Sequence, residues 1–302
     1  MMMSLCLLTR LLQTFCRRLE WSVVTSTLKF SQVDVFSSER HRGNPVAVVH
    51  DADALSTEDM ARFARWTNLS ETTFLLTPSD SEADYRLRIF TPGGELPFAG
   101  HPTLGSCHAW LEEGGTPQCS DEIFQQCELG LVRIRNTAQA LSFAAPDLLR
   151  TGPIEPELVN TLMAALSLPA DALLDHQWVD NGPGWCALLL DSAQRVLDVS
   201  PDFSALGTNC LGLVGRHAAG SDSDFEVRAF VPDMGIPEDP VTGSLNASIA
   251  QWLIRTGQAP ANYTATQGRV LGRAGRICIN GTSDEVWVGG ATETGIRGEV
   301  KF

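Results

Sequence analysis

The stretch Tyr85-Arg-Leu-Arg-Ile-Phe-Thr-Pro92 occurs a second time in this chain, as Phe225-Glu-Val-Arg-Ala-Phe-Val-Pro232, at an offset of 140 residues. Alternation of apolar and polar residues predicts a β-strand in both copies, and the proline ends each strand. The agreement continues downstream, where Leu96-Pro97 falls on Ile236-Pro237 at the same offset. Such self-similarity indicates two copies of one structural unit.

A helix is predicted after each copy. With the offset changed to 138, His101-Pro-Thr-Leu-Gly-Ser106 aligns with Asp239-Pro-Val-Thr-Gly-Ser244, and a helical pattern containing Trp-Leu and ending at a glycine follows each segment. Proline favours the first turn of a helix, so we expect one helix to begin at about Pro102 and the other at about Pro240 or Thr242.

The repeat predicts an α+β fold of two pseudo-symmetric lobes, over about residues 28–145 and 146–292. A pseudo-twofold axis would bring the N-termini of the two helices to a common cleft. Helix N-termini present free N–H groups and the positive end of the helix dipole, so this cleft would hold a substrate carboxylate. Residues 1–27 have no counterpart in the repeat and are predicted to lie outside the fold, either as a transit-like segment or as an upstream start without a role.

Composition excludes several functions. The chain has 302 residues, 43% of them hydrophobic, and a net charge of -14, which disfavours nucleic acid and membrane partners. Of its 22 basic residues only Lys29 and Lys301 are lysines, so neither a Schiff-base site nor a P-loop is expected. The eight scattered cysteines show no metal-ligand spacing, which favours reduced thiols in a cytoplasmic protein without a metal site.

Three titratable residues are candidates for parts of a site. Asp239 and His101 are equivalent in the repeat alignment, which suggests two halves of one site, although Asp239 could simply cap its helix. Glu71 lies between a helix predicted over Thr57–Thr67 and a strand predicted over Thr72–Thr77. Read alone, Glu71 is better explained as a solvated loop charge or a local cap.

Several segments in order resemble the PhzF-like family, which is named after the phenazine-biosynthesis isomerase. They extend from about residue 28 to the end of the chain, and they are Val33-Asp-Val-Phe, Gly43-Asn-Pro-Val-Ala-Val, Asn68-Leu-Ser-Glu-Thr-Thr-Phe, Phe90-Thr-Pro, Glu95-Leu-Pro-Phe-Ala-Gly-His-Pro and Pro237-Glu-Asp-Pro-Val-Thr-Gly-Ser. The resemblance implies the diaminopimelate-epimerase-like fold, in which each lobe is a β-sheet or barrel wrapped around a central helix. It also implies a homodimer and a C-terminal strand, about 295–302, that returns to the first lobe.

The resemblance also implies roles for single residues. The family's acid/base glutamate falls on Glu71, its histidine on His101 and its aspartate on Asp239, which makes these three the candidate catalytic residues. The substrate-binding positions fall on the residues at the two helix starts, Gly100, Gly243 and Ser244.

The function expected from the resemblance is a cofactor-independent isomerase that moves a proton or double bond on a small carboxylate substrate. One alternative is a non-catalytic protein that binds a small molecule in the same cleft. Another is an epimerase of amino or hydroxy acids. Racemases of the wider fold use a cysteine at each helix start, and neither helix start has one here, which disfavours the epimerase.

Overall fold

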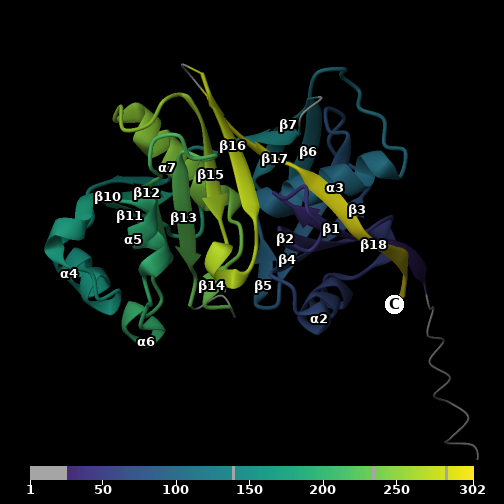
Figure 1. Cartoon of the computed structure of the whole chain (residues 1–302). Coiled ribbons are helices and arrows are strands. Elements are labelled where there is room, and N and C mark those ends of the chain that lie inside the picture. Colours follow the sequence, from purple (N-terminus) through teal and green to yellow (C-terminus); the bar gives the residue numbers. More distant parts are fainter. Residues whose placement is uncertain (1–25, 138–139, 233–235, 283–284) are drawn as a thin grey trace, which may run out of the picture.

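The computed structural model describes residues 26–137, 140–232, 236–282 and 285–302. It shows two lobes side by side, each built from a β-sheet and a central helix (Figure 1). The first lobe contains β1 (Thr27–Val35), β2 (Asn44–Val49), α2 (Thr57–Thr67), β3 (Glu71–Leu76), β4 (Tyr85–Thr91), β5 (Gly94–Leu96), α3 (Gly100–Glu112), β6 (Ile123–Cys127), β7 (Gly130–Asn136) and β8 (Leu141–Ala144).

The second lobe repeats this order with additional helices. Its elements are β9 (Arg150–Gly152), α4 (Pro156–Ala165), β10 (Leu173–Asp180), β11 (Cys186–Leu190), α5 (Ala193–Asp198), α6 (Phe203–Leu206), β12 (Leu211–Arg216), β13 (Phe225–Phe230), β14 (Glu238–Asp239), α7 (Gly243–Arg255), β15 (Asn262–Gln267), β16 (Gly275–Gly281) and β17 (Val286–Gly290). The last strand, β18 (Thr292–Lys301), returns to the first lobe.

Strand pairing confirms the internal duplication. From β1 to β8 the successive pairs are antiparallel β1–β2, parallel β2–β3, antiparallel β3–β4 and β4–β5, parallel β4–β6, and antiparallel β6–β7 and β7–β8. From β10 to β17 the same sequence of pairs recurs. The two lobes join where β8 pairs with β17.

The central helices α3 and α7 have 13 residues each, and their apolar side chains belong to one core that spans both lobes. In α7 the buried side chains include Leu245, Ile249, Trp252 and Leu253, as the helical periodicity predicts. Two further helices, α2 and α4, lie on outer faces of the sheets, where their apolar side chains form smaller hydrophobic clusters.

The alignment of the helix starts at offset 138 is wrong. Helix α3 begins at Gly100 and α7 at Gly243, so the helices are equivalent at an offset of 143. Register supports this offset, because Glu95 pairs with Phe90 and Glu238 pairs with Phe230 at equivalent places. The offset rises from 140 at the strands to 143 at the helices because the connection from Phe230 to Glu238 is three residues longer than that from Phe90 to Glu95.

The corrected offset removes the equivalence of the two titratable residues. Asp239 corresponds to Leu96, and His101 corresponds to Ser244. Asp239 is also no N-cap, because it lies in β14 and the N-cap residue of α7 is Thr242. Asp239 and His101 are therefore not symmetric halves of one site.

Each lobe is completed by a strand that directly follows the last strand of the other lobe. Strand β9 follows the last strand of the first lobe and pairs with β10, and β18 follows the last strand of the second lobe and pairs with β1. In Figure 1 the yellow β18 crosses to the first lobe and runs beside β1. Of the predicted extension 1–27, Thr27 begins β1 and the Ser26 carbonyl accepts a hydrogen bond from the Phe302 N–H; residues 1–25 lie outside the described residues.

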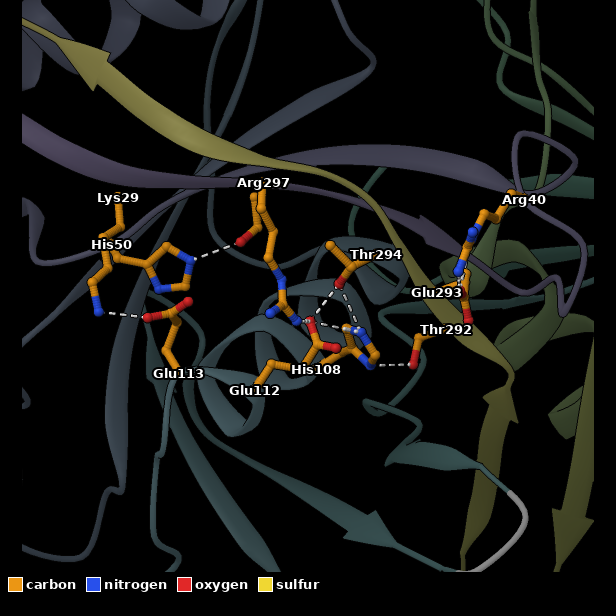
Figure 2. Close-up of polar contacts among 11 residues, drawn as sticks. Lys29, Arg40, His50, His108, Glu112, Glu113, Thr292, Glu293, Thr294 and Arg297 are labelled. Atoms are coloured by element: carbon orange, nitrogen blue, oxygen red, sulfur yellow. Dashed lines mark hydrogen bonds and ion pairs between the residues drawn. The ribbon is translucent and has the colours of Figure 1, made fainter.

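Polar side chains attach β18 to the central helix α3 (Figure 2). The two ring nitrogens of His108 lie 2.9 Å from Thr292 Oγ1 and 3.0 Å from Thr294 Oγ1. Glu112, one turn further along α3, forms an ion pair with Arg297. These contacts fix the returning strand over the C-terminal half of α3. Within the described ranges, no helix is both long enough and apolar enough to cross a bilayer.

Candidate active site

Local sequence places Glu71 at the beginning of a buried strand. Helix α2 begins with a capping box between Ser56 and Asp59, and it ends at Asn68, whose left-handed backbone (φ 54°) reverses the chain. Strand β3 then starts at Glu71, which pairs with Val46 of β2 in parallel register. The predicted helix Thr57–Thr67 is confirmed, and the strand begins one residue earlier than predicted.

A buried ion pair with Arg228 fixes Glu238, the residue directly before Asp239. The Arg228 guanidinium donates two hydrogen bonds to Glu238, at 2.9 and 2.8 Å, and both side chains are less than a tenth exposed. Because Glu238 is held in this way, the two-residue strand β14 directs Asp239 toward the first lobe. The Asp239 carboxylate accepts a hydrogen bond of 2.6 Å from the Thr242 hydroxyl.

The starts of α3 and α7 meet directly. A Cβ atom added to Gly100 would lie 2.9 Å from the Cα atom of Gly243, and the converse substitution gives the same distance. Only glycines allow the two helices to approach this closely. Neither N-cap residue, Ala99 in α3 or Thr242 in α7, donates or accepts a side-chain hydrogen bond that caps its helix. Because the two helix starts touch, the positive ends of both helix dipoles face the same place.

The fully buried Asn44 connects the catalytic candidates from both lobes. Its amide nitrogen lies 3.3 Å from His101 Nδ1, 3.1 Å from Asp239 Oδ1 and 2.9 Å from the Val241 carbonyl oxygen. On the other side of the ring, His101 Nε2 lies 3.4 Å from Glu71 Oε2. The structure thus brings all three predicted catalytic residues together, and Asn44 is a site residue that the sequence analysis did not identify.

Burial changes the protonation of these groups. Burial first, and then the negative charge of Asp239, raise the pKa of Glu71 to about 8. Burial raises the pKa of Asp239 to about 6, against the hydrogen bonds from Thr242 and Asn44, which lower it. Burial lowers the pKa of His101 to about 3, so its imidazole is neutral near pH 7. Two neighbouring carboxyl groups therefore titrate at different pH values.

A cavity of about 470 Å³ opens beside these groups. Glu71 and Ala99 of the first lobe and Asp239, Thr242 and Ser244 of the second lobe line it, so it lies between the lobes. Most of the remaining wall is apolar: Leu96, Pro97, Phe98, Leu129, Leu149, Pro183, Trp185, Val231 and Ile236. Size, apolar walls and converging polar groups are typical of a small-molecule site.

The predicted residues lie at different depths in this site. Glu71, Asp239 and Ser244 face the cavity, whereas His101 lies behind Glu71 and contacts its carboxylate. Gly100 and Gly243 are buried where the helices touch and are not among the residues that line the cavity wall. The Ser244 hydroxyl accepts a hydrogen bond of 3.1 Å from the Trp185 indole N–H.

Known proteins resemble this chain both in sequence and in fold. The sequence profile of the family described as "Phenazine biosynthesis-like protein" matches residues 33–298. The chain belongs to the PhzF-like family. Among family members, the trans-2,3-dihydro-3-hydroxyanthranilate isomerase of Pseudomonas aeruginosa is 35% identical over 259 residues, which are 82% of this chain and 88% of that protein. Antisense-enhancing sequence 1 of Schizosaccharomyces pombe is 37% identical over 292 residues, 89% of this chain and 97% of that protein.

Solved structures agree with the family assignment. The PhzF-family protein of Enterococcus faecalis superposes with a TM-score of 0.74 at 26% identity, over 91% of this chain and 99% of that one. The fold is the α+β, diaminopimelate-epimerase-like arrangement of two pseudo-symmetric lobes. As a PhzF-like protein with isomerases among its relatives, the chain is an isomerase.

Neither of the two helix starts in this PhzF-like chain has a cysteine. Cys107 is fully buried within α3, and burial raises its pKa to about 12. The residues that precede the helix-start glycines are Ala99 and Thr242. Across the described ranges, no three His, Cys, Asp or Glu side chains gather in a way that could hold a metal ion.

Proposed function

We propose that this PhzF-like isomerase moves a proton between two carbon atoms of a small carboxylate substrate, with Glu71 as the single acid/base group and without a cofactor. The observation that carries the proposal is the position of the Glu71 carboxyl, which is enclosed between the lobes and lines the cavity beside Asp239; this burial raises its pKa to about 8. An acid/base group is most effective when its pKa is near the working pH. Glu71 satisfies this condition because it is buried, whereas an exposed glutamate does not.

The proposed step uses one proton and one pair of electrons. Ionised Glu71 takes a proton from a C–H bond of the substrate, and the electron pair of that bond shifts the adjacent double bond. Protonated Glu71 then gives the proton to the carbon at the other end of the shifted system. The carboxyl returns to its ionised form, so the reaction is an isomerisation with no net exchange of electrons.

The surrounding groups have separate parts in this proposal. The first-turn N–H groups of α3 and α7 bind the substrate carboxylate, because both helix dipoles point to the shared place where the helices meet. Neutral His101 lies behind the Glu71 carboxylate, with Nε2 3.4 Å from Oε2, and closes that side of the carboxylate to solvent. Asp239 keeps the pKa of Glu71 high by charge repulsion and orients an amino or hydroxyl group of the substrate.

The test is proton exchange with solvent. The substrate named for the Pseudomonas aeruginosa relative, trans-2,3-dihydro-3-hydroxyanthranilate, is the first probe, and a panel of small amino and hydroxy acids follows. In heavy water, the parent should exchange one substrate C–H proton, as read by proton NMR. Glu71→Gln keeps the size of the side chain but cannot carry a proton, so exchange should fall by a factor of about 10²–10⁴.

The outcomes separate the alternatives. Exchange by Glu71→Gln at the parent rate would show that Glu71 is not the base. Tight binding of a carboxylate with no exchange by the parent would favour the non-catalytic binding protein. The homodimer remains a prediction from the family resemblance, and the cytoplasmic location remains a prediction from the scattered cysteines; light scattering of the purified chain tests the homodimer.

A further inference from the structure

Asn181, on the second-lobe wall of the cavity, has a buried hydrogen-bond acceptor that is not used. The residue directly follows β10, and only 9% of it is exposed. Its amide nitrogen donates a hydrogen bond of 2.9 Å to the main-chain carbonyl of Ser244, in the first turn of α7. Its oxygen, Oδ1, is buried and has no hydrogen-bond partner among the described residues.

The orientation of this amide follows from its partner. A carbonyl oxygen only accepts hydrogen bonds, so the Asn181 atom that faces the Ser244 carbonyl must be the nitrogen. The remaining atom must therefore be the oxygen, which can only accept. Buried polar atoms in native proteins are almost always satisfied, so an orphan acceptor in a cavity wall indicates a partner that is supplied by a ligand.

The cavity gives Oδ1 a place to meet such a ligand. Asn181 lines it together with Glu71 of the first lobe and with Asp239 and Ser244 of its own lobe. The Trp185 indole donates to the Ser244 hydroxyl, so this hydroxyl and the Asn181 amide are both fixed to the first turn of α7. Asn181 is thus anchored to the helix start where the substrate carboxylate is expected.

We propose that Asn181 is a specificity-determining residue: its Oδ1 atom accepts a hydrogen bond from an amino or hydroxyl group that the substrate carries in addition to its carboxylate. The inference rests on the proposed function, because it uses the same cavity and the same carboxylate position. It narrows the substrate class to carboxylates that have an apolar body about the size of a ring and, in addition, an N–H or O–H donor. Carboxylates of the same size without a donor would leave Oδ1 unpaired and bind less well.

Binding of three related probes tests this assignment by calorimetry. Benzoate has the ring and the carboxylate alone, and 2-aminobenzoate and 3-hydroxybenzoate each add one donor. For the parent protein, we expect at least one donor-bearing probe to bind about five- to tenfold more tightly than benzoate, as the gain from one hydrogen bond implies. Asn181→Ala should abolish this preference and change the affinity for benzoate less than twofold.

Two further variants separate specificity from structural damage. Gln251 is a matched control, since its Nε2 atom also donates to a carbonyl, that of Pro146 at 3.1 Å, and its Oε1 atom is also buried without a partner in the described part of the chain, but Gln251 does not line the cavity. Gln251→Ala should keep the full preference. Asn181→Asp replaces the N–H that donates to the Ser244 carbonyl by a second oxygen, so all three probes should weaken together through charge repulsion and the loss of this anchor.

The inference is overturned if the parent shows no preference for a donor-bearing probe, including the case in which no probe binds. It is also overturned if the preference survives in Asn181→Ala, or if Gln251→Ala loses it equally. The proposed function fails separately, through solvent exchange that does not depend on Glu71. Lost discrimination among the probes in Asn181→Ala, combined with solvent exchange by the parent that depends on Glu71, would support both proposals.

Discussion

Replacement of Glu71 by glutamine should make the protein more stable, and the gain should grow with pH. In the folded protein, burial and Asp239 raise the pKa of the Glu71 carboxyl from 4.5 to about 8. In the unfolded chain the same carboxyl ionises at its ordinary pKa. Between these two values the folded state holds a proton that the unfolded state has released, so the free energy of unfolding of the parent falls as pH rises from about 4.5 to about 8.

The size of the effect follows from the pKa difference. One pH unit within this window corresponds to about 1.4 kcal/mol for one proton. From pH 5 to pH 7, the parent should lose about 2–3 kcal/mol of stability through Glu71. Glutamine does not titrate, so Glu71→Gln avoids this loss. The stability difference between variant and parent should therefore be small near pH 4.5 and should increase by about 2–3 kcal/mol between pH 5 and pH 7.

Urea unfolding at pH 5, 6, 7 and 8, followed by tryptophan fluorescence and by circular dichroism, measures this difference. Glu58→Gln is the matched control, because it removes the same group from the exposed first turn of α2. Its curve should run parallel to that of the parent at all four pH values. Parallel curves for Glu71→Gln as well would refute the reasoning, since they would show that the folded state does not raise the pKa of Glu71.

Two more predictions concern the neighbours of Glu71. Asp239→Asn should move the ascending limb of the pH–rate profile to lower pH, because Glu71 acts in its ionised form and the charge of Asp239 raises its pKa; an unmoved limb would remove this coupling. Gly243→Ala should lower the stability to urea by about 1–3 kcal/mol, because the new Cβ atom would lie 2.9 Å from the Cα atom of Gly100. The control Gly298→Ala adds a Cβ atom in open space and should change stability little, and equal losses in the two variants would contradict this reading of the helix contact.

The sequence predicts the parts of this fold that depend on local patterns. Alternation identifies the two repeated strands β4 and β13, and the helix predicted over Thr57–Thr67 is observed as α2. The helices α3 and α7 begin close to the predicted Pro102 and Thr242, but their alignment was wrong because it matched prolines, whereas the equivalent residues are the glycines Gly100 and Gly243. Those glycines are required by contact between two helices 143 residues apart, and no local signal reports that contact.

The site shows the same division between local and tertiary causes. Glu71 by itself reads as a loop charge, since its burial depends on the second lobe, and only the family resemblance pointed to its role. Asn44 stands within the Gly43-Asn-Pro segment that carries the resemblance, but its role depends on contacts with Asp239 and Val241, nearly 200 residues away. The orphan oxygen of Asn181 is likewise visible only when the partners of its amide are known.

The exchange of terminal strands has a consequence for folding during synthesis. Strand β1 pairs along its whole length with β18, and more than 250 residues separate Thr27 from its partner Lys301. Until those residues have been made, the ribosome-bound first lobe presents β1 with one edge unpaired, and unpaired edges are templates for aggregation. We therefore expect the first lobe to depend on chaperones during translation, and its completion by β18 to be a slow, late step because the closing loop spans almost the entire chain.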